Sequence, residues 1–163
     1  MPRSGQPDII GKVNEKKEAE GWGGCAIKVT AAVIENGGKV LIARRKKGDR
    51  FEGLWEFPGG KIEAGENPRE CLRRELREEM DVEAEAGELL CSVPFETSGL
   101  SIELMAFRTR LSPGDVRCHD HDEIRWIEPE RLEDFDLSEP DRRVAAIVFP
   151  RRHRDGETKG CGR

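Results

Sequence analysis

Residues 59–82 of the chain read GGKIEAGENPRECLRRELREEMDV, and this stretch decides which fold the sequence can form. It opens with a glycine pair and passes into a run of strong helix formers. Asn67 can cap such a helix, Pro68 suits its first position, and Glu70 stands where a capping box needs an acid. We therefore predict a helix over residues 68–80 that is entered from a glycine turn.

The acids of this predicted helix gather on one side. At about 100° per residue, Glu75, Glu78 and Glu79 share a face that borders the apolar stripe of the helix. Carboxylates at this spacing repel one another by about 0.2–0.5 kcal/mol per pair, and acids that merely solubilise a helix belong on its far side. Converging carboxylates suit Mg²⁺, which prefers oxygen ligands and adds waters and substrate phosphates to them. The pattern favours a divalent-cation site.

Strands surround the helix along the sequence. Apolar and β-branched residues 25–34 are followed by Asn36-Gly37-Gly38 and by residues 39–43, which predicts a β-hairpin. Further strands are predicted near residues 54–57, 89–95, 101–109 and 124–127, and a second helix over residues 139–149. Many strands with few helices favour the α+β class, in which helices pack on a mixed sheet.

Composition and charge narrow the classes of function. The chain has 163 residues, about one domain, and its net charge of −5 lacks the basic footprint of a protein that binds duplex nucleic acid. No apolar run approaches the roughly 18 residues of a membrane span, and the first residues lack the apolar core of a signal peptide. The five cysteines include no C-x-x-C pair. We expect a cytoplasmic monomer or homodimer with free thiols and a small-molecule substrate.

The chain is expected to consist of three segments. Residues 1–22 are polar and interrupted by glycine and proline, which predicts a flexible arm. Residues 23–150 would form the single folded domain. Residues 151–163 have almost no apolar content, and this predicts a disordered tail.

At their spacing, several positions of the opening stretch resemble the Nudix box, the signature of hydrolases that cleave a nucleoside diphosphate linked to another group. These positions are Gly60, Glu66, Arg74, Glu75, Leu76, Glu78, Glu79 and Val82. One position departs, because Asp81 stands where the family usually carries glycine; aspartate tolerates a left-handed backbone better than most residues, so we expect a small loss of stability only. The resemblance covers about residues 28–149 and implies the Nudix fold, an α/β/α sandwich with a mixed sheet between helices.

The resemblance also implies roles for the matching residues. Glu78 and Glu79 would be ligands of Mg²⁺, or of Mn²⁺, together with the backbone carbonyl of Gly59. Glu75 would be either a metal ligand or the base that activates water. The supporting residues would be Gly60, Glu66 and Arg74, of which the arginine orients the acids.

Some family members recruit a further acid from a loop beyond the sheet. Residues 119–123 read HDHDE, and Asp120 stands six residues before Trp126 at the matching position. By resemblance Asp120 would be a metal-linked acid or the general base, although such a charge run by itself is typical of a solvated loop. The histidines on either side are expected to position Asp120 rather than to form a zinc site.

The segments LIARR and LWEFPGGK before the box, and the later F-x-L-x-x-x-D, resemble the MutT-like branch of the family. Enzymes of this branch act on 8-oxo-dGTP or CTP and release pyrophosphate. By this resemblance Arg45 would contact the phosphates or the base, Phe57 would line the base pocket and Asp141 would read the base edge. Two alternatives stay open, because Ser138 and Asp141 also form a capping-box pattern and Phe57 could be plain core.

The expected activity is Mg²⁺-dependent hydrolysis of a nucleoside triphosphate to the monophosphate and pyrophosphate, as sanitation of the nucleotide pool. An oxidised purine or a cytosine nucleotide would be the substrate. One alternative is a Nudix hydrolase of a sugar nucleotide, ADP-ribose or a dinucleotide polyphosphate. Another is a non-catalytic nucleotide-binding module, which the complete set of box acids disfavours.

Overall fold

The computed structural model describes residues 26–151, so the predicted arm 1–22 and residues 152–163 of the predicted tail lie outside the described part. Its elements in chain order are β1 (Ile27–Asn36), β2 (Lys39–Arg45), β3 (Trp55–Glu56), α1 (Pro68–Met80), β4 (Ala84–Thr97), β5 (Leu100–Leu111), β6 (His121–Ile127), the 3₁₀ helix η2 (Pro129–Asp134) and α2 (Glu139–Val148). No helix in this part of the chain is long and apolar enough to cross a membrane.

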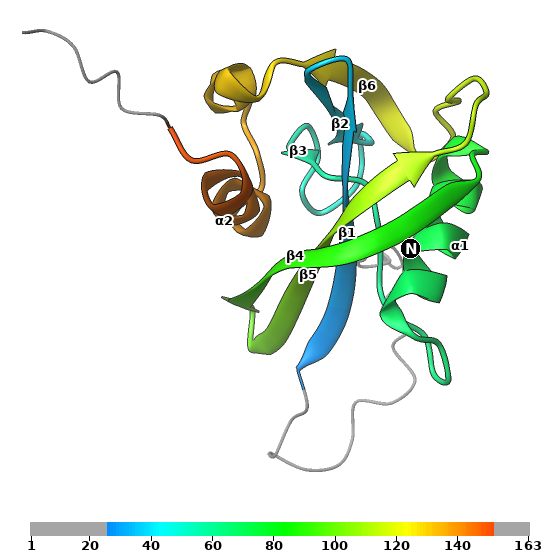
Figure 1. Cartoon of the computed structure of the whole chain (residues 1–163). Coiled ribbons are helices and arrows are strands. Elements are labelled where there is room, and N and C mark those ends of the chain that lie inside the picture. The colour runs from blue at the N-terminus through cyan, green and yellow to red at the C-terminus, as the bar shows by residue number, and fades with distance from the viewer. Residues whose placement is uncertain (1–25, 152–163) are drawn as a thin grey trace, which may run out of the picture.

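The strands form a mixed sheet of six, in the order β3-β2-β1-β5-β4, with β6 paired to β2. The predicted hairpin is confirmed, and its turn places Gly37 and Gly38 at φ 57° and 77°, a region that glycine enters without a steric penalty. Beyond the turn the two strands diverge. β1 pairs in parallel with β5, whereas β2 pairs antiparallel with β3 and β6 (Figure 1).

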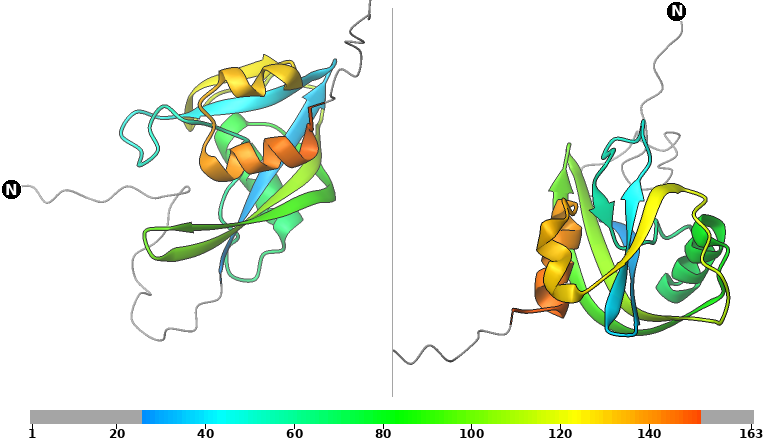
Figure 2. Two further views of the ribbon diagram at one scale, coloured as in Figure 1. Left: turned by 90° about the vertical axis from the view of Figure 1, so that its left-hand side faces the viewer. Right: turned by 90° about the horizontal axis from the view of Figure 1, so that it is seen from above.

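Alternation along β1 explains why helices cover both faces of the sheet. Ala31 and Val33 point into the apolar cluster that contains Val144 of α2, while Ala32 and Ile34 point into the cluster that contains the buried side of α1. The buried side of α1 comprises Cys71, Leu72, Leu76 and Met80, of which the last three belong to this cluster. Figure 2 shows the strands lying between the two helices. The predicted α/β/α sandwich is confirmed.

The caps of α1 are those that the sequence predicts. The Asn67 side chain accepts hydrogen bonds from the backbone N–H groups of Arg69 and Glu70, and the Glu70 carboxylate accepts one from Asn67 N at 3.0 Å. The helix ends at Asp81, whose φ of 55° and ψ of 37° are left-handed. Local signals therefore determine both ends of this helix.

Two features go beyond the prediction. β4 begins at Ala84 rather than near residue 89, and its pairing with β5 shifts between Ala86 and Leu89 and again before Cys91. These bulges take up extra residues, so the early part of β4 is a strand only because β5 lies beside it. The short helix η2, which starts at a proline, was not predicted.

Replacement of Asp81 by glycine is expected to stabilise the protein by about 1 kcal/mol, because a left-handed backbone costs an L-residue roughly 1–2 kcal/mol. Asp81→Ala is the control, since it keeps the Cβ and loses the same exposed contact with Arg117 at 3.3 Å. Thermal unfolding measures the difference. An Asp81→Gly melting temperature no higher than that of Asp81→Ala would contradict this account of the helix end.

Candidate active site

The acid-bearing face of α1 forms one wall of a cleft of about 410 Å³. Glu75, Glu78 and Glu79 line this wall, and Asp120, just before β6, lines the same cleft. Gly59 also lines the cleft. The structure thus brings together all five residues that the sequence predicts for metal binding, even though they belong to three separate segments of the chain.

Glu79 is the most deeply placed of these acids. Its Oε2 is buried and has no hydrogen-bond partner among the described residues. Burial, together with the charges of Glu56 and Glu75, raises the pKa of Glu79 well above its ordinary value. A buried, unpaired carboxylate oxygen is costly, and it indicates that this position is built to face a positive group.

Arg74 organises the acids around it. Its Nε and Nη2 donate to the two carboxylate oxygens of Glu66 at 2.8 and 3.0 Å. Its Nη1 donates to Glu75 at 2.8 Å and to Glu78 at 3.4 Å. The hydrogen bond from Arg74 lowers the pKa of Glu66. Such a bidentate pair restricts the orientation of both side chains, which is the geometry that the predicted supporting roles require.

At both glycines of the Pro-Gly-Gly turn an added Cβ would clash with a neighbouring group. The turn runs along β1, with Thr30 N donating to Gly60 O and Ala32 N to Pro58 O, both at 2.7 Å. A Cβ on Gly59 would lie 2.1 Å from the carbonyl oxygen of Thr30, and one on Gly60 would lie 2.3 Å from Cδ of Glu75. Glycine is needed here because the loop packs closely against β1 on one side and against Glu75 on the other.

The cleft fits a divalent cation through its chemistry. The described residues contain no group of three His, Cys, Asp or Glu side chains that already converge around one point. Mg²⁺ does not require such a cage, because waters and substrate phosphates complete its shell. The carboxylates and the Gly59 carbonyl are oxygen donors, and the unpaired oxygen of Glu79 lies among them.

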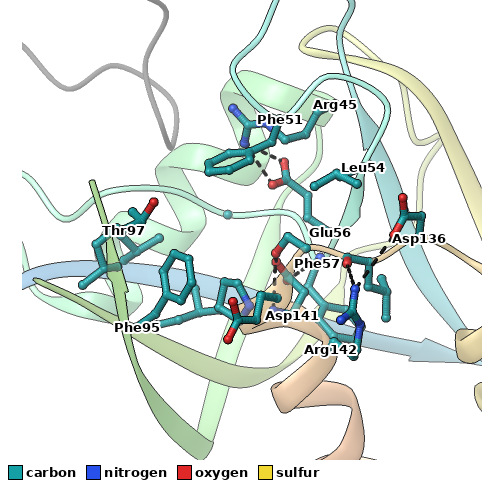
Figure 3. A pocket seen from close by; sticks show the side chains of 18 of the residues that line it. Arg45, Phe51, Leu54, Glu56, Phe57, Phe95, Thr97, Asp136, Asp141 and Arg142 are labelled. Carbon is teal, nitrogen blue, oxygen red and sulfur yellow. Dashed lines mark hydrogen bonds and ion pairs between the residues drawn. The ribbon is translucent and has the colours of Figure 1, made fainter. Parts of the chain in front are cut away.

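A second cavity, of about 430 Å³, opens beside the cleft between the sheet and α2. Its walls are largely apolar and carry Phe51, Leu54 and Phe95, with Asp141 as a buried polar group (Figure 3). Besides Asp141, polar residues such as Arg45, Glu56 and Ser138 line it. A cavity that combines apolar walls with placed polar groups is typical of sites that bind a small organic ligand. Its size and lining suit a nucleoside.

Asp141 lines this cavity, and its carboxylate contacts both the backbone beside β3 and the N-cap residue of its own helix. Its Oδ1 accepts a hydrogen bond from Phe57 N at 2.9 Å, and the Ser138 hydroxyl donates to its Oδ2. Burial and the charge of Glu56 raise the pKa of Asp141 to about 7. Ser138 caps α2, but its own N–H donates to Trp55 O, so the capping box is only half formed.

The phenylalanines divide between core and cavity. Phe57 lines the cavity but is only 3% exposed and packs in the core, so core and pocket are both correct descriptions of it. Phe51 and Phe95 are half-buried cavity residues that the sequence analysis missed. Phe51 belongs to the loop between β2 and β3, where no periodic pattern marks a binding residue.

Glu56 is the other residue that the sequence analysis missed. Its carboxylate accepts hydrogen bonds from Arg45 Nη1 at 2.9 and 3.3 Å and lies 3.0 Å from His121 Nε2. The expectation that His119 and His121 position Asp120 is wrong for His121, because its buried ring contacts Glu56 instead. Asp120 is held by Lys46 at 3.3 Å.

This sandwich fold, with its acid-lined cleft and adjoining cavity, defines a class of hydrolase. The family model described as NUDIX domain matches residues 26–147, and the chain belongs to the Nudix hydrolase family. It is 42% identical to the CTP pyrophosphohydrolase of Escherichia coli K12 over 115 residues, which are 71% of this chain and 85% of that protein. It is 36% identical to the putative 8-oxo-dGTP diphosphatase 2 of Mycobacterium tuberculosis H37Rv, over 70% of this chain and 82% of that protein.

Solved structures agree with this assignment. The solution structure of the E. coli ORF135 protein matches with a TM-score of 0.67 and 38% identity, covering 76% of this chain and 88% of that one. The crystal structure of the MutT protein from Methanosarcina mazei Go1 matches with a TM-score of 0.70 and 26% identity, over 77% and 94% of the two chains. The chain is a MutT-like Nudix hydrolase.

The glycine pair provides a test of this site. Gly60→Ala should push aside the flexible end of Glu75 and lower kcat/KM by about 10- to 100-fold, with little change in melting temperature. Gly59→Ala should instead lower the stability by about 1–3 kcal/mol, because it meets the fixed backbone of β1. Assays of both variants on one triphosphate, with thermal unfolding, separate the two effects. Unchanged activity in Gly60→Ala would refute the role given to this contact.

Proposed function

We propose that this enzyme hydrolyses a nucleoside triphosphate to the monophosphate and pyrophosphate with Mg²⁺, or Mn²⁺, as cofactor, and thereby sanitises the cytoplasmic nucleotide pool. The observation that carries the proposal is the continuity of an acid-lined cleft with a nucleoside-sized apolar cavity. A triphosphate chain needs cations around it, and a base needs an apolar slot. The two cavities offer these next to each other.

The relatives support the same class of substrate. Their names assign them to CTP and to 8-oxo-dGTP, and the matched residues cover 85% and 82% of the two proteins. We therefore propose a cytosine nucleotide or an oxidised purine nucleotide as substrate. Asp141, which lines the apolar cavity, would form a hydrogen bond with the base. Its carboxyl group can accept a hydrogen bond and, when protonated, can also donate one.

The residues of the cleft would act on the phosphate chain. Glu78, Glu79 and the Gly59 carbonyl would hold the cation, with Asp120 facing them. When bound, the cation neutralises phosphate charge and lowers the pKa of a bound water. Arg45 would bind the phosphate nearest the sugar. Glu75 or Asp120 would take the proton of the attacking water. The water oxygen would form a new P–O bond while the bridging P–O bond of the phosphoanhydride breaks, and this leaves monophosphate and pyrophosphate.

Product analysis tests this proposal. Incubation with dCTP, CTP and 8-oxo-dGTP in the presence of Mg²⁺ should release pyrophosphate and the matching monophosphate from at least one of them. Removal of the cation with EDTA should stop the reaction, and added Mg²⁺ should restore it. Release of orthophosphate and a nucleoside diphosphate as the main products would refute the proposal.

Glu78→Gln should lower the turnover number in the same assay by about 100-fold or more, because it removes a negative charge from the metal shell. The matched control is Glu88→Gln on β4. Like Glu78, Glu88 is an exposed carboxylate that pairs with an arginine, here Arg108, but it does not line the cleft. Both variants should melt like the wild type. A Glu78→Gln enzyme with near-normal turnover at saturating Mg²⁺ would remove Glu78 from the site.

Replacement of Asp141 by alanine should flatten the preference between dCTP and 8-oxo-dGTP, since a site that loses its hydrogen-bonding group loses discrimination. Ser138→Ala is the comparison, because it removes the helix cap, at a cost of about 0.5–2 kcal/mol, and keeps the carboxyl group. The ratio of kcat/KM values and the melting temperature are measured for each variant. An unchanged ratio in Asp141→Ala with a lowered melting temperature would leave Asp141 a purely structural role.

A further inference from the structure

The cleft and the apolar cavity meet at a shared border. Three residues line both of them, namely Arg45, Glu56 and Gly59. In a nucleoside triphosphate the sugar joins the base to the phosphates. If the base fills the apolar cavity and the phosphates fill the cleft, as the function proposed above requires, the sugar lies at this border. One side chain there, Glu56, is a carboxylate.

Glu56 is held in a fixed position by its neighbours. Arg45 Nη1 lies 2.9 Å from Oε2 and 3.3 Å from Oε1, and His121 Nε2 lies 3.0 Å from Oε1. Burial opposes the ionisation of Glu56, but the hydrogen bond from His121 and the charge of Arg45 outweigh it and keep its pKa below the ordinary value. The group is therefore an anion with a defined orientation.

This anion has one hydrogen-bonding position left. A carboxylate offers about four lone-pair sites, and the contacts with Arg45 and His121 occupy three of them, so the free site is on Oε2. The side chain keeps 16% of its surface exposed, at the border of the two cavities it lines. A phosphate oxygen would be repelled there, whereas a hydroxyl group would donate a proton to it and form a strong, charge-assisted hydrogen bond.

We infer that Glu56 is a specificity-determining residue that accepts a hydrogen bond from the 3′-hydroxyl of the substrate's sugar. The 3′-hydroxyl is the one that ribonucleotides and deoxyribonucleotides share, so a site that reads it accepts both kinds of sugar. Arg45 and His121 are positioning residues in this arrangement, because they hold the carboxylate in place. A site built around a substrate hydroxyl rejects analogues that lack it.

Substrates that differ only in this hydroxyl test the inference. The values of kcat/KM are measured for dCTP and 8-oxo-dGTP, each beside its 2′,3′-dideoxy analogue, with the wild type, Glu56→Gln and Glu103→Gln. Glu103 is the matched control, since it lies on β5 outside both cavities and pairs with Ser92. The wild type and the control should prefer the hydroxyl-bearing substrate by about tenfold or more. In Glu56→Gln this preference should fall towards one.

Each other result has a definite meaning. Equal rates of the wild type on both members of a pair would overturn the inference and leave the proposed hydrolysis intact, and this measurement needs no variant to fold. A Glu56→Gln enzyme that loses activity equally on both members would show that Glu56 only supports Arg45. If Glu56→Gln changes the ratio between dCTP and 8-oxo-dGTP but keeps the preference for the hydroxyl-bearing substrate, Glu56 contacts the base instead of the sugar. This result would also overturn the inference. Absence of pyrophosphate release from every triphosphate would instead refute the proposed function.

Discussion

The close packing of the Pro58-Gly59-Gly60 turn against β1 is the constraint on which the site depends. Its two glycines leave no room for a Cβ, because one faces the backbone of β1 and the other faces the carboxylate of Glu75. The turn begins two residues after Glu56 and leads into the loop before α1. One backbone segment thus sets the positions of Glu56, the Gly59 carbonyl and the acid face of α1 relative to each other.

Charge balance explains why the acids can be gathered in this way. Arg74 forms ion pairs with Glu66 and Glu75, and Arg45 forms one with Glu56. Glu79 lies between these groups with an oxygen that no described residue contacts. Its raised pKa follows from burial among like charges, and a cation in the cleft would relieve the same repulsion. The unpaired negative charge of the cleft thus lies where the proposed reaction would need a cation.

Two cavities adjoin the sheet, whose strands β1 and β2 separate after the turn between them. β1 continues beside β5, and β2 continues beside β3 and β6 (Figure 1). α1 covers one face of the sheet and α2 the other, so the acid cleft and the apolar cavity open on either side of the glycine turn. Arg45, at the end of β2, reaches both. A substrate with one polar and one apolar half would meet both surfaces without a large movement of the chain.

The sequence by itself determined the elements whose causes are local. The capping box at Asn67 and the acid face of α1 arise from residues within a few positions of one another, so their spacing alone predicted them. The left-handed end at Asp81 was expected from the resemblance to the Nudix box, which usually carries glycine there. The apolar, β-branched run of β1 and the glycine hairpin turn are local in the same sense. The resemblance to the Nudix box then supplied the expectation for the whole fold.

Only the tertiary structure decided the remainder of the site. His121 contacts Glu56 across 65 positions of sequence, and Asp141 contacts the backbone of Phe57 across 84. Phe51 and Phe95 face one cavity from a loop and from a distant strand. No periodicity or spacing records such contacts, because they depend on how separate strands and loops are packed against each other. The sequence could therefore name Asp120 and the acids of α1, but not Glu56 or the partners that hold Glu56 and Asp141 in place.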